Sequence, residues 1–239
     1  MDSNILVVTD DVHALGIAPV GCQIRNLDVQ SGPDALDAEI NEINQLTGDA
    51  SARLESDIVE GSRELFRRLG RPDQEPAGEQ LVKLIEARGF NRNNNIVDAY
   101  NIVGARSGAV MGMHDAGEID GPVTIRRAEG GETMLPIFHE DSETAAAGDL
   151  LWEFDGDLLA LLGPVSRDAD AFKVTEATDD VLLVVPGNPA LSEADGRALC
   201  RDTFELIKRT CPTATMEFLD VRRDVATDSH TATSMPADD

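Results

Sequence analysis

Hydrophobic and polar positions along the first half of the chain repeat with the period of helices. Apolar residues recur every three or four positions from Ser51 to Leu69, which places them on one helical face, and Gly70 and Pro72 end the pattern. A second such segment ends at Gly89, a residue suited to a helix C-cap. The pattern predicts a buried strand over residues 4–9 and helices over residues 34–46, 51–69, 78–88 and 96–103.

The second half of the chain changes to short aliphatic and β-branched runs, separated by Gly, Pro, Asp or Ser. These runs predict strands over residues 123–126, 133–138, 150–154, 158–162 and 181–185. An amphipathic helix follows over residues 192–209, with Ser192 and Asp195 spaced as a capping box. Helices first and strands later predict an α+β fold whose strands form a curled, largely antiparallel sheet or barrel, closed by the C-terminal helix.

Length and composition fit one globular domain. The chain has 239 residues, of which 41% are hydrophobic and 27% charged. We expect a single domain over residues 1–221 and a disordered acidic tail over residues 222–239, where no apolar period remains. The apolar runs are too short to cross a bilayer and the N-terminus lacks a signal-peptide pattern, so we expect a soluble cytoplasmic protein without membrane contact.

The charge balance is strongly acidic. Twenty Lys and Arg face 45 Asp and Glu, which gives a net charge of −25, and only three cations are lysines. Acidity spread along the whole chain predicts adaptation to multimolar salt, where the Debye length of ~3 Å screens the self-repulsion. At ordinary salt this charge argues against binding of a phosphate backbone. In a salt-adapted protein, RNA recognition would depend on shape, stacking and hydrogen bonds.

No metal or cofactor site is predicted. The three cysteines are isolated, and the four histidines lack the spacing of a metal site. The chain also lacks a phosphate-binding loop, a dinucleotide-binding glycine motif behind a strand and a nucleophile elbow. Candidate chemistry must therefore come from polar residues in otherwise apolar or turn contexts.

Four segments carry such residues, and each also has a purely structural interpretation. An Asp and an Asn share one face of a helix, a His precedes an Asp, an Arg and a Glu flank a Gly-Gly turn, and two Thr flank another turn. The structural alternatives are, in the same order, a helix cap with a solvated polar face, a turn histidine, a cross-strand ion pair and local backbone hydrogen bonds. The residues are Asp98 and Asn101, His114 and Asp115, Arg126 and Glu132, and Thr175 and Thr178.

In this order and spacing, the four segments resemble the B3/B4 domain of the phenylalanyl-tRNA synthetase β-subunit in its stand-alone form. The matching motifs are Val-Asp-x-x-Asn, a Gly-bearing segment that ends in Asp, Ile-Arg-x-Ala followed by Gly-Glu, and Val-Thr-x-x-Thr. The resemblance covers about residues 60–212, with residues 1–50 as an extension packed on the domain. It implies an α+β domain with a mixed sheet curled into a barrel and no cofactor.

The resemblance also implies a function. In the synthetase, this domain hydrolyses tyrosine misattached to tRNA by means of a bound water. The position of its editing Glu, four residues before the Val of Val-Thr, falls on Asp170 here, which would orient the water. The family His three residues before Asp115 is replaced by Gly112, with His114 two positions later. The residues expected to bind substrate are Asp98, Asn101, His114, Asp115, Arg126, Glu132 and Thr175.

Three functions remain open at this point. The leading one is a domain that binds tRNA or aminoacyl-tRNA, either without catalysis or as a deacylase acting in trans on the ester of a mischarged tRNA. The second is a binder or hydrolase of a free amino-acid derivative in the same cleft. The third is a module that docks on a synthetase or another protein. The sequence leaves open whether the protein is an enzyme and what its oligomeric state is.

Overall fold

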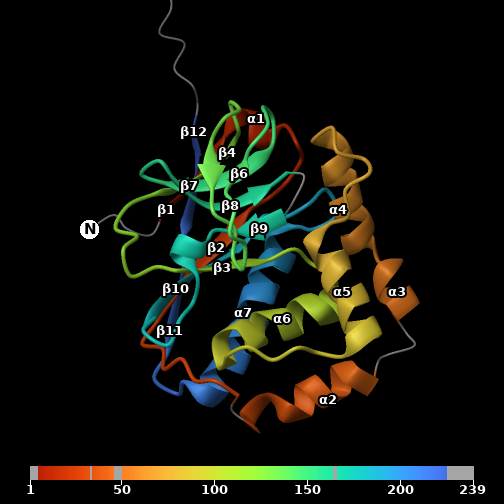
Figure 1. Cartoon of the computed structure of the whole chain (residues 1–239), viewed down its shortest axis with the longest axis vertical. Coiled ribbons are helices and arrows are strands. Elements are labelled where there is room, and N and C mark those ends of the chain that lie inside the picture. Colours follow the sequence, from red (N-terminus) through yellow and green to blue (C-terminus); the bar gives the residue numbers. More distant parts are fainter. Residues whose placement is uncertain (1–4, 33, 46–49, 164–165, 225–239) are drawn as a thin grey trace, which may run out of the picture.

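The computed structural model describes residues 5–32, 34–45, 50–163 and 166–224. Within these ranges the chain forms an α+β fold with two main sheets and a layer of helices (Figure 1). The helices are α1 (Asp10–His13), α2 (Asp37–Gln45), α3 (Ala50–Leu54), α4 (Asp57–Arg68), α5 (Ala77–Arg88), α6 (Asn95–Ser107) and α7 (Glu193–Thr210), and the 3-10 turns are η1 (Asp34–Leu36) and η2 (Asp170–Phe172).

The larger sheet has six strands in the order β12-β1-β4-β7-β8-β9. β1 pairs in parallel with both β12 and β4, whereas the other pairs are antiparallel, so the sheet is mixed as predicted. Its strands are β1 (Ile5–Thr9), β4 (Val123–Arg127), β7 (Leu150–Phe154), β8 (Asp157–Leu162), β9 (Ser166–Asp168) and β12 (Asp220–Asp224).

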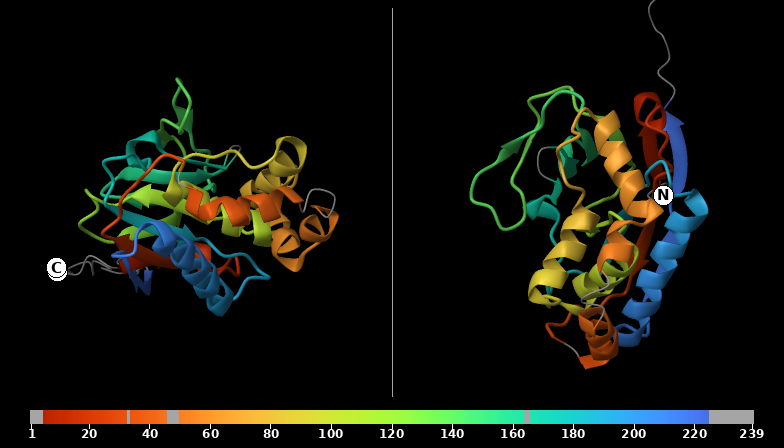
Figure 2. Two further views of the ribbon diagram at one scale, coloured as in Figure 1. Left: turned by 90° about the horizontal axis from the view of Figure 1, so that it is seen from below. Right: turned by 90° about the vertical axis from the view of Figure 1, so that its right-hand side faces the viewer.

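The smaller main sheet has four antiparallel strands in the order β11-β2-β10-β3. They are β2 (Val20–Arg25), β3 (Gly112–Asp115), β10 (Asp180–Val185) and β11 (Thr215–Phe218). A separate hairpin of β5 (Thr133–Met134) and β6 (Glu143–Thr144) projects from the body in both views of Figure 2. The helices α3, α4 and α5 lie on the side of the molecule away from β1 and β10 (Figure 1).

Two hydrophobic clusters meet at β10. On one face of the strand, Val181, Leu183 and Val185 belong to a core shared with α6 and α7. On the other face, Leu182 and Val184 belong to a core shared with β1, β4, β7 and β8. Because successive side chains of a strand point to opposite faces, the five consecutive apolar residues 181–185 of one strand can serve both cores.

Most predicted elements are present, with boundary changes. The capping box of Ser192 and Asp195 begins α7 as predicted. The predicted helix over 96–103 is longer, because Asn94 caps it at the start and Gly108 adopts the left-handed C-cap conformation at the end. The predicted strand over 133–138 is reduced to β5, because the following residues form turns.

Two expectations were wrong, and one strand was missed. No sheet of the described ranges closes into a barrel, because β12 and β9 remain edges of one sheet and β11 and β3 edges of the other. The predicted tail begins too early, since residues 222–224 belong to β12; residues 225–239 lie outside the described residues. In addition, no strand was predicted between residues 9 and 34, but β2 lies there and is central in its sheet, so residues 5–25 supply strands to both sheets.

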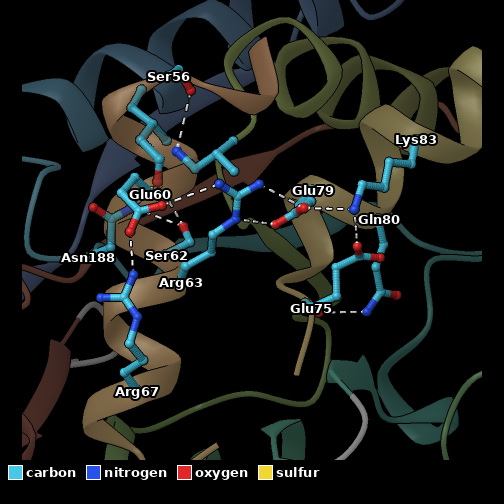
Figure 3. A network of polar contacts seen from close by, with 12 residues as sticks. Ser56, Glu60, Ser62, Arg63, Arg67, Glu75, Glu79, Gln80, Lys83 and Asn188 are labelled. Atoms are coloured by element: carbon cyan, nitrogen blue, oxygen red, sulfur yellow. Dashed lines mark hydrogen bonds and ion pairs between the residues drawn. The ribbon is translucent and has the colours of Figure 1, made fainter. Parts of the chain in front are cut away.

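A network of polar contacts fixes α5 against α4 (Figure 3). Arg63 on α4 donates two hydrogen bonds of 2.8 Å each to the carboxylate of Glu79 on α5, and Lys83 lies 2.8 Å from the same carboxylate. The side chain of Glu79 is only 6% exposed, and hydrogen bonding to Arg63 lowers its pKa against the effect of burial. Removal of Arg63 would therefore leave a buried carboxylate with one cation.

We expect Arg63→Met to lower the free energy of unfolding by about 2 kcal/mol, less than the full cost of breaking a buried pair because Lys83 remains. The matched control is Arg67→Met, whose pairs with Glu60 and Glu64 are solvent-exposed and should contribute no more than about 0.5 kcal/mol. Denaturant unfolding of both variants in one buffer checks the difference. Equal losses in the two variants would contradict a special role for the Glu79 contact.

Candidate functional site

A cavity of about 670 Å³ lies beside the core between the sheets. Its wall is formed by α5, α6, β3, β7, β8, β9 and the turn after β5. Most of the wall is apolar, with Leu81, Trp152 and Leu162 among its residues. A cavity of this size and character, with a small number of polar groups, is typical of a small-molecule or end-group binding site.

The central feature of the wall is the juxtaposition of β3 with β9. Gly112 and His114 lie two residues apart on β3 and so share a face of the strand, and both line the cavity with Asp168 of β9. A Cβ atom on residue 112 would lie 3.1 Å from His114 Nε2 and 3.2 Å from Asp168 Oδ1. The missing side chain at Gly112 therefore gives the imidazole and the carboxylate their space.

Asp168 and His114 are both electrostatically unusual. Nε2 of His114 lies 4.0 Å from Oδ1 of Asp168, and the backbone N–H of Met113 donates to the Asp168 carboxylate. Burial raises the pKa of Asp168 to about 7 and lowers the pKa of His114 to about 4. Near neutral pH the imidazole is thus uncharged, and the carboxyl group can both accept and release a proton.

Two side chains in this wall are buried although their ring nitrogens form no hydrogen bond in the described part of the chain. His114 is fully buried and Trp152 is 3% exposed, yet both ring nitrogens of His114 and the indole Nε1 of Trp152 lack a hydrogen-bond partner in the described part of the chain. Buried polar atoms normally have partners, since an unsatisfied group costs about 1–3 kcal/mol. Both side chains line the cavity, so these unpaired ring nitrogens belong to residues of its wall.

Other polar groups complete the wall. Asn101 and Tyr100 approach from α6, and burial, followed by the nearby Asp168 charge, raises the pKa of Tyr100 so that it stays protonated. Arg167 adds a cation, and its guanidinium donates to the carbonyl oxygen of Ser166 at 3.0 Å. Within the described ranges, no group of three His, Cys, Asp or Glu side chains is placed to hold a metal ion.

Of the predicted substrate-binding residues, Asn101 and His114 line the cavity and the others form hydrogen bonds elsewhere. The carboxylate of Asp98 accepts from the backbone N–H of Asn93, so it acts at the start of α6. Asp115 accepts from the hydroxyl of Thr178 and from the backbone N–H of Gly117.

The remaining predicted residues also lie in local networks. Arg126 pairs with Glu132 across the Gly-Gly turn at 2.9 Å and with Glu153 at 2.7 Å. Glu132 lies outside the strands and β4 does not pair with β5, so the cross-strand partner of Arg126 is Glu153 on β7. The hydroxyl of Thr175 accepts from the backbone N–H of Ala177 within its own turn. Asp170, the predicted catalytic residue, lies in η2 and pairs with Lys173 at 2.8 Å outside the cavity wall.

Sequence reasoning missed Asp168 and Trp152. The sequence does show Asp168 two residues before Asp170, but counting back from Val174 selects the later acid. Only the pairing of β9 with β8 places Asp168 beside β3. Trp152 reads as an ordinary core residue in its strand, and nothing in the local sequence distinguishes it from one.

The family model of the B3/4 domain matches residues 62–203, more than half of the chain. The chain belongs to the B3/4 domain family. This confirms the predicted resemblance over about residues 60–212 and shows that the cavity lies inside the family domain, because all of its lining residues fall between positions 77 and 186.

The fold of this B3/4 domain protein is similar to that of an N-terminal fragment of the phenylalanyl-tRNA synthetase β-subunit from Pyrococcus horikoshii. The TM-score is 0.53 at 12% sequence identity, and the match covers 93% of this chain and 53% of that one. The chain therefore spans about half the length of the fragment, and at this identity the likeness shows the fold alone. A search of curated proteins found no match. No helix in the described ranges is long and apolar enough to span a membrane.

The Asp168 carboxyl group gives this B3/4 domain a measurable pH signature. An acid whose pKa is higher in the folded state holds its proton there between about pH 4 and 7, so unfolding releases it and stability falls as pH rises. Asp168→Asn removes this dependence. As pH rises through that window, we expect the free energy of unfolding of the wild type to fall relative to that of the variant. The difference should change by at most about 1.4 kcal/mol per pH unit.

Denaturant unfolding at several pH values measures this difference. Asp170→Asn is the matched control, because it removes a partly exposed carboxylate two residues away that lies outside the cavity wall. Parallel pH profiles for Asp168→Asn and the wild type would show that the cavity carboxyl group titrates like an exposed one.

Proposed function

We propose that this B3/4 domain protein binds the aminoacyl end of a charged tRNA, with the amino acid in the cavity, and hydrolyses its ester bond. The observation that carries the proposal is the convergence of Asp168, His114 and Trp152 on one largely apolar cavity, where the ring nitrogens of His114 and Trp152 have no hydrogen-bond partner in the described residues. An apolar wall suits an amino-acid side chain, whereas the polar groups suit its ester and amine.

One departure from the family pattern supports the proposal. The resemblance expects an imidazole at position 112, and this chain has Gly112 there with His114 two residues later, in the cavity wall. The acid that the resemblance expects is present as Asp170, but a second acid, Asp168, is the one that lines the cavity. On a strand, a shift of two residues keeps the same face, so His114 can serve the cavity from a new position while Gly112 leaves it room.

In the proposed reaction, the carboxylate of Asp168 accepts a proton from a water whose oxygen attacks the ester carbonyl carbon. The bond between this carbon and the ribose oxygen breaks, and the proton held by Asp168 passes to that oxygen. The indole N–H of Trp152 and the N–H of neutral His114 are the candidate donors to the negative charge that develops on the carbonyl oxygen. A pKa of about 7 suits Asp168 to both proton transfers.

The test is a deacylation assay in molar potassium chloride with tRNA for phenylalanine mischarged with tyrosine, alongside other charged tRNAs. We expect Asp168→Asn to lower ester hydrolysis about 10²–10⁴-fold, as for loss of a general base. Asp170→Ala is measured beside it, because the sequence pattern assigns the catalytic acid to Asp170. Activity lost in Asp170→Ala and kept in Asp168→Asn would return the role to Asp170.

Other outcomes separate the remaining functions. Binding of charged tRNA without hydrolysis would leave a binding module. Hydrolysis of a free amino-acid ester that nuclease treatment does not change would favour the small-molecule enzyme. Absence of both, with a synthetase retained by the protein at high salt, would favour the docking module.

A further inference from the structure

Exposed apolar side chains gather at the mouth of the cavity. Among the described residues, four large hydrophobic side chains are exposed, and two of them, Leu84 and Phe138, line the cavity. Phe138 is 92% exposed, and its neighbour His139 also lines the cavity. An aromatic ring that is almost fully solvated beside a binding cavity lacks any packing role within the described part of the fold.

The backbone holds Phe138 in this exposed position at a cost. Its φ of 65° lies in the left-handed region, which is unusual for a bulky residue and costs of order 1–3 kcal/mol. The backbone N–H of His139 donates to the carbonyl of Pro136 at 3.1 Å and closes the turn that displays the ring. Such strain persists where the surrounding structure fixes it and is common at ligand-binding sites.

The same turn is tied to the segment that carries the cavity acid. The backbone N–H of Ile137 donates to the carbonyl of Asp168 at 3.0 Å, and that of Asp170 donates to the carbonyl of Leu135 at 2.8 Å. Pro136 and Ala169 form an isolated bridge between these two bonds. Phe138 is thus fixed in position relative to Asp168.

We propose that Phe138 is a stacking platform for the terminal adenine of the charged tRNA. This inference rests on the proposed function. In every charged tRNA the amino acid is esterified to the ribose of the terminal adenosine, so a ligand with its ester at Asp168 has its base beside that ester, at the cavity mouth. Phe138 and His139 present aromatic rings at that mouth, and Arg167 supplies a cation to the same wall for a phosphate.

The charge of the chain favours this mode of recognition. With a net charge of −25, attraction between lysine or arginine and the phosphate backbone contributes little to binding, and high salt weakens it further. Stacking of a base on an aromatic side chain needs no charge and accepts any base with a π-face. One exposed ring beside the reacting group is therefore a salt-tolerant contact with the RNA end.

The experiment measures binding of an RNA minihelix that ends in single-stranded CCA and carries tyrosine through an amide link, which resists hydrolysis. A second probe is identical except that its terminal nucleotide is abasic. We expect Phe138→Ala to weaken binding of the first probe about 5- to 100-fold, the range for loss of one base–aromatic stack. The same variant should bind the abasic probe as the wild type does.

Two further variants act as controls. Phe138→Tyr keeps a ring at this position and should keep the affinity for the adenine probe within about twofold. Leu135→Ala removes an exposed apolar side chain from the same turn, outside the cavity wall, and should bind both probes like the wild type.

If Phe138→Ala weakens binding of both probes equally, or of neither, the stacking platform is wrong. The proposed function would stand in that case, because binding of the probes by the wild type tests it separately. If the wild type binds neither probe, the proposed function fails and the platform fails with it.

Discussion

The structure depends on β10, a strand that is buried on both faces. Val181, Leu183 and Val185 point into the core with α6 and α7, and Leu182 and Val184 point into the core between the sheets. Its two neighbours, β2 and β3, come from parts of the chain more than 60 residues away from it, so the strand joins distant segments into one unit. A polar residue at any of these five positions would disturb one of the two cores.

The cavity exists because of this arrangement. β3 pairs with one edge of β10 and turns the face of Gly112 and His114 toward the space between the sheets. Its other neighbour in space is β9, the last strand of the six-stranded sheet, which brings Asp168. The edges of two sheets therefore meet at the cavity, and a closed barrel would have paired these edges with strands instead. The open edges leave the Asp168 carboxyl group and the His114 imidazole in the wall of the cavity.

Polar networks around the cavity hold its walls in place without entering it. Arg63 and Glu79 fix α5, the carboxylate of Asp98 holds the backbone N–H of Asn93 just before α6, and the pair of Arg126 with Glu132 shapes the turn before β5. These contacts explain why several polar residues that stand out in the sequence lie outside the cavity. Asp and Asn near helix starts, and Arg and Glu across a Gly-Gly turn, are explained by local backbone and charge requirements.

The sequence by itself determined most of the helices, most of the long strands and the family, although the helix predicted over residues 51–69 is divided into α3 and α4. These features can be identified locally, because each depends on residues within one or two helical turns. They are the periodic spacing of apolar residues, the N-caps Asn94 and Ser192, and the glycines that end helices. Tertiary structure decided the rest. β2 contains a glycine and polar residues, and only its place between β10 and β11 makes it a strand. The pairing of β9 with β8 decides whether Asp168 or Asp170 faces the cavity. The contact of Gly112 with β9 decides whether His114 has room. Both contacts join residues that are distant in sequence, so local patterns do not reveal them.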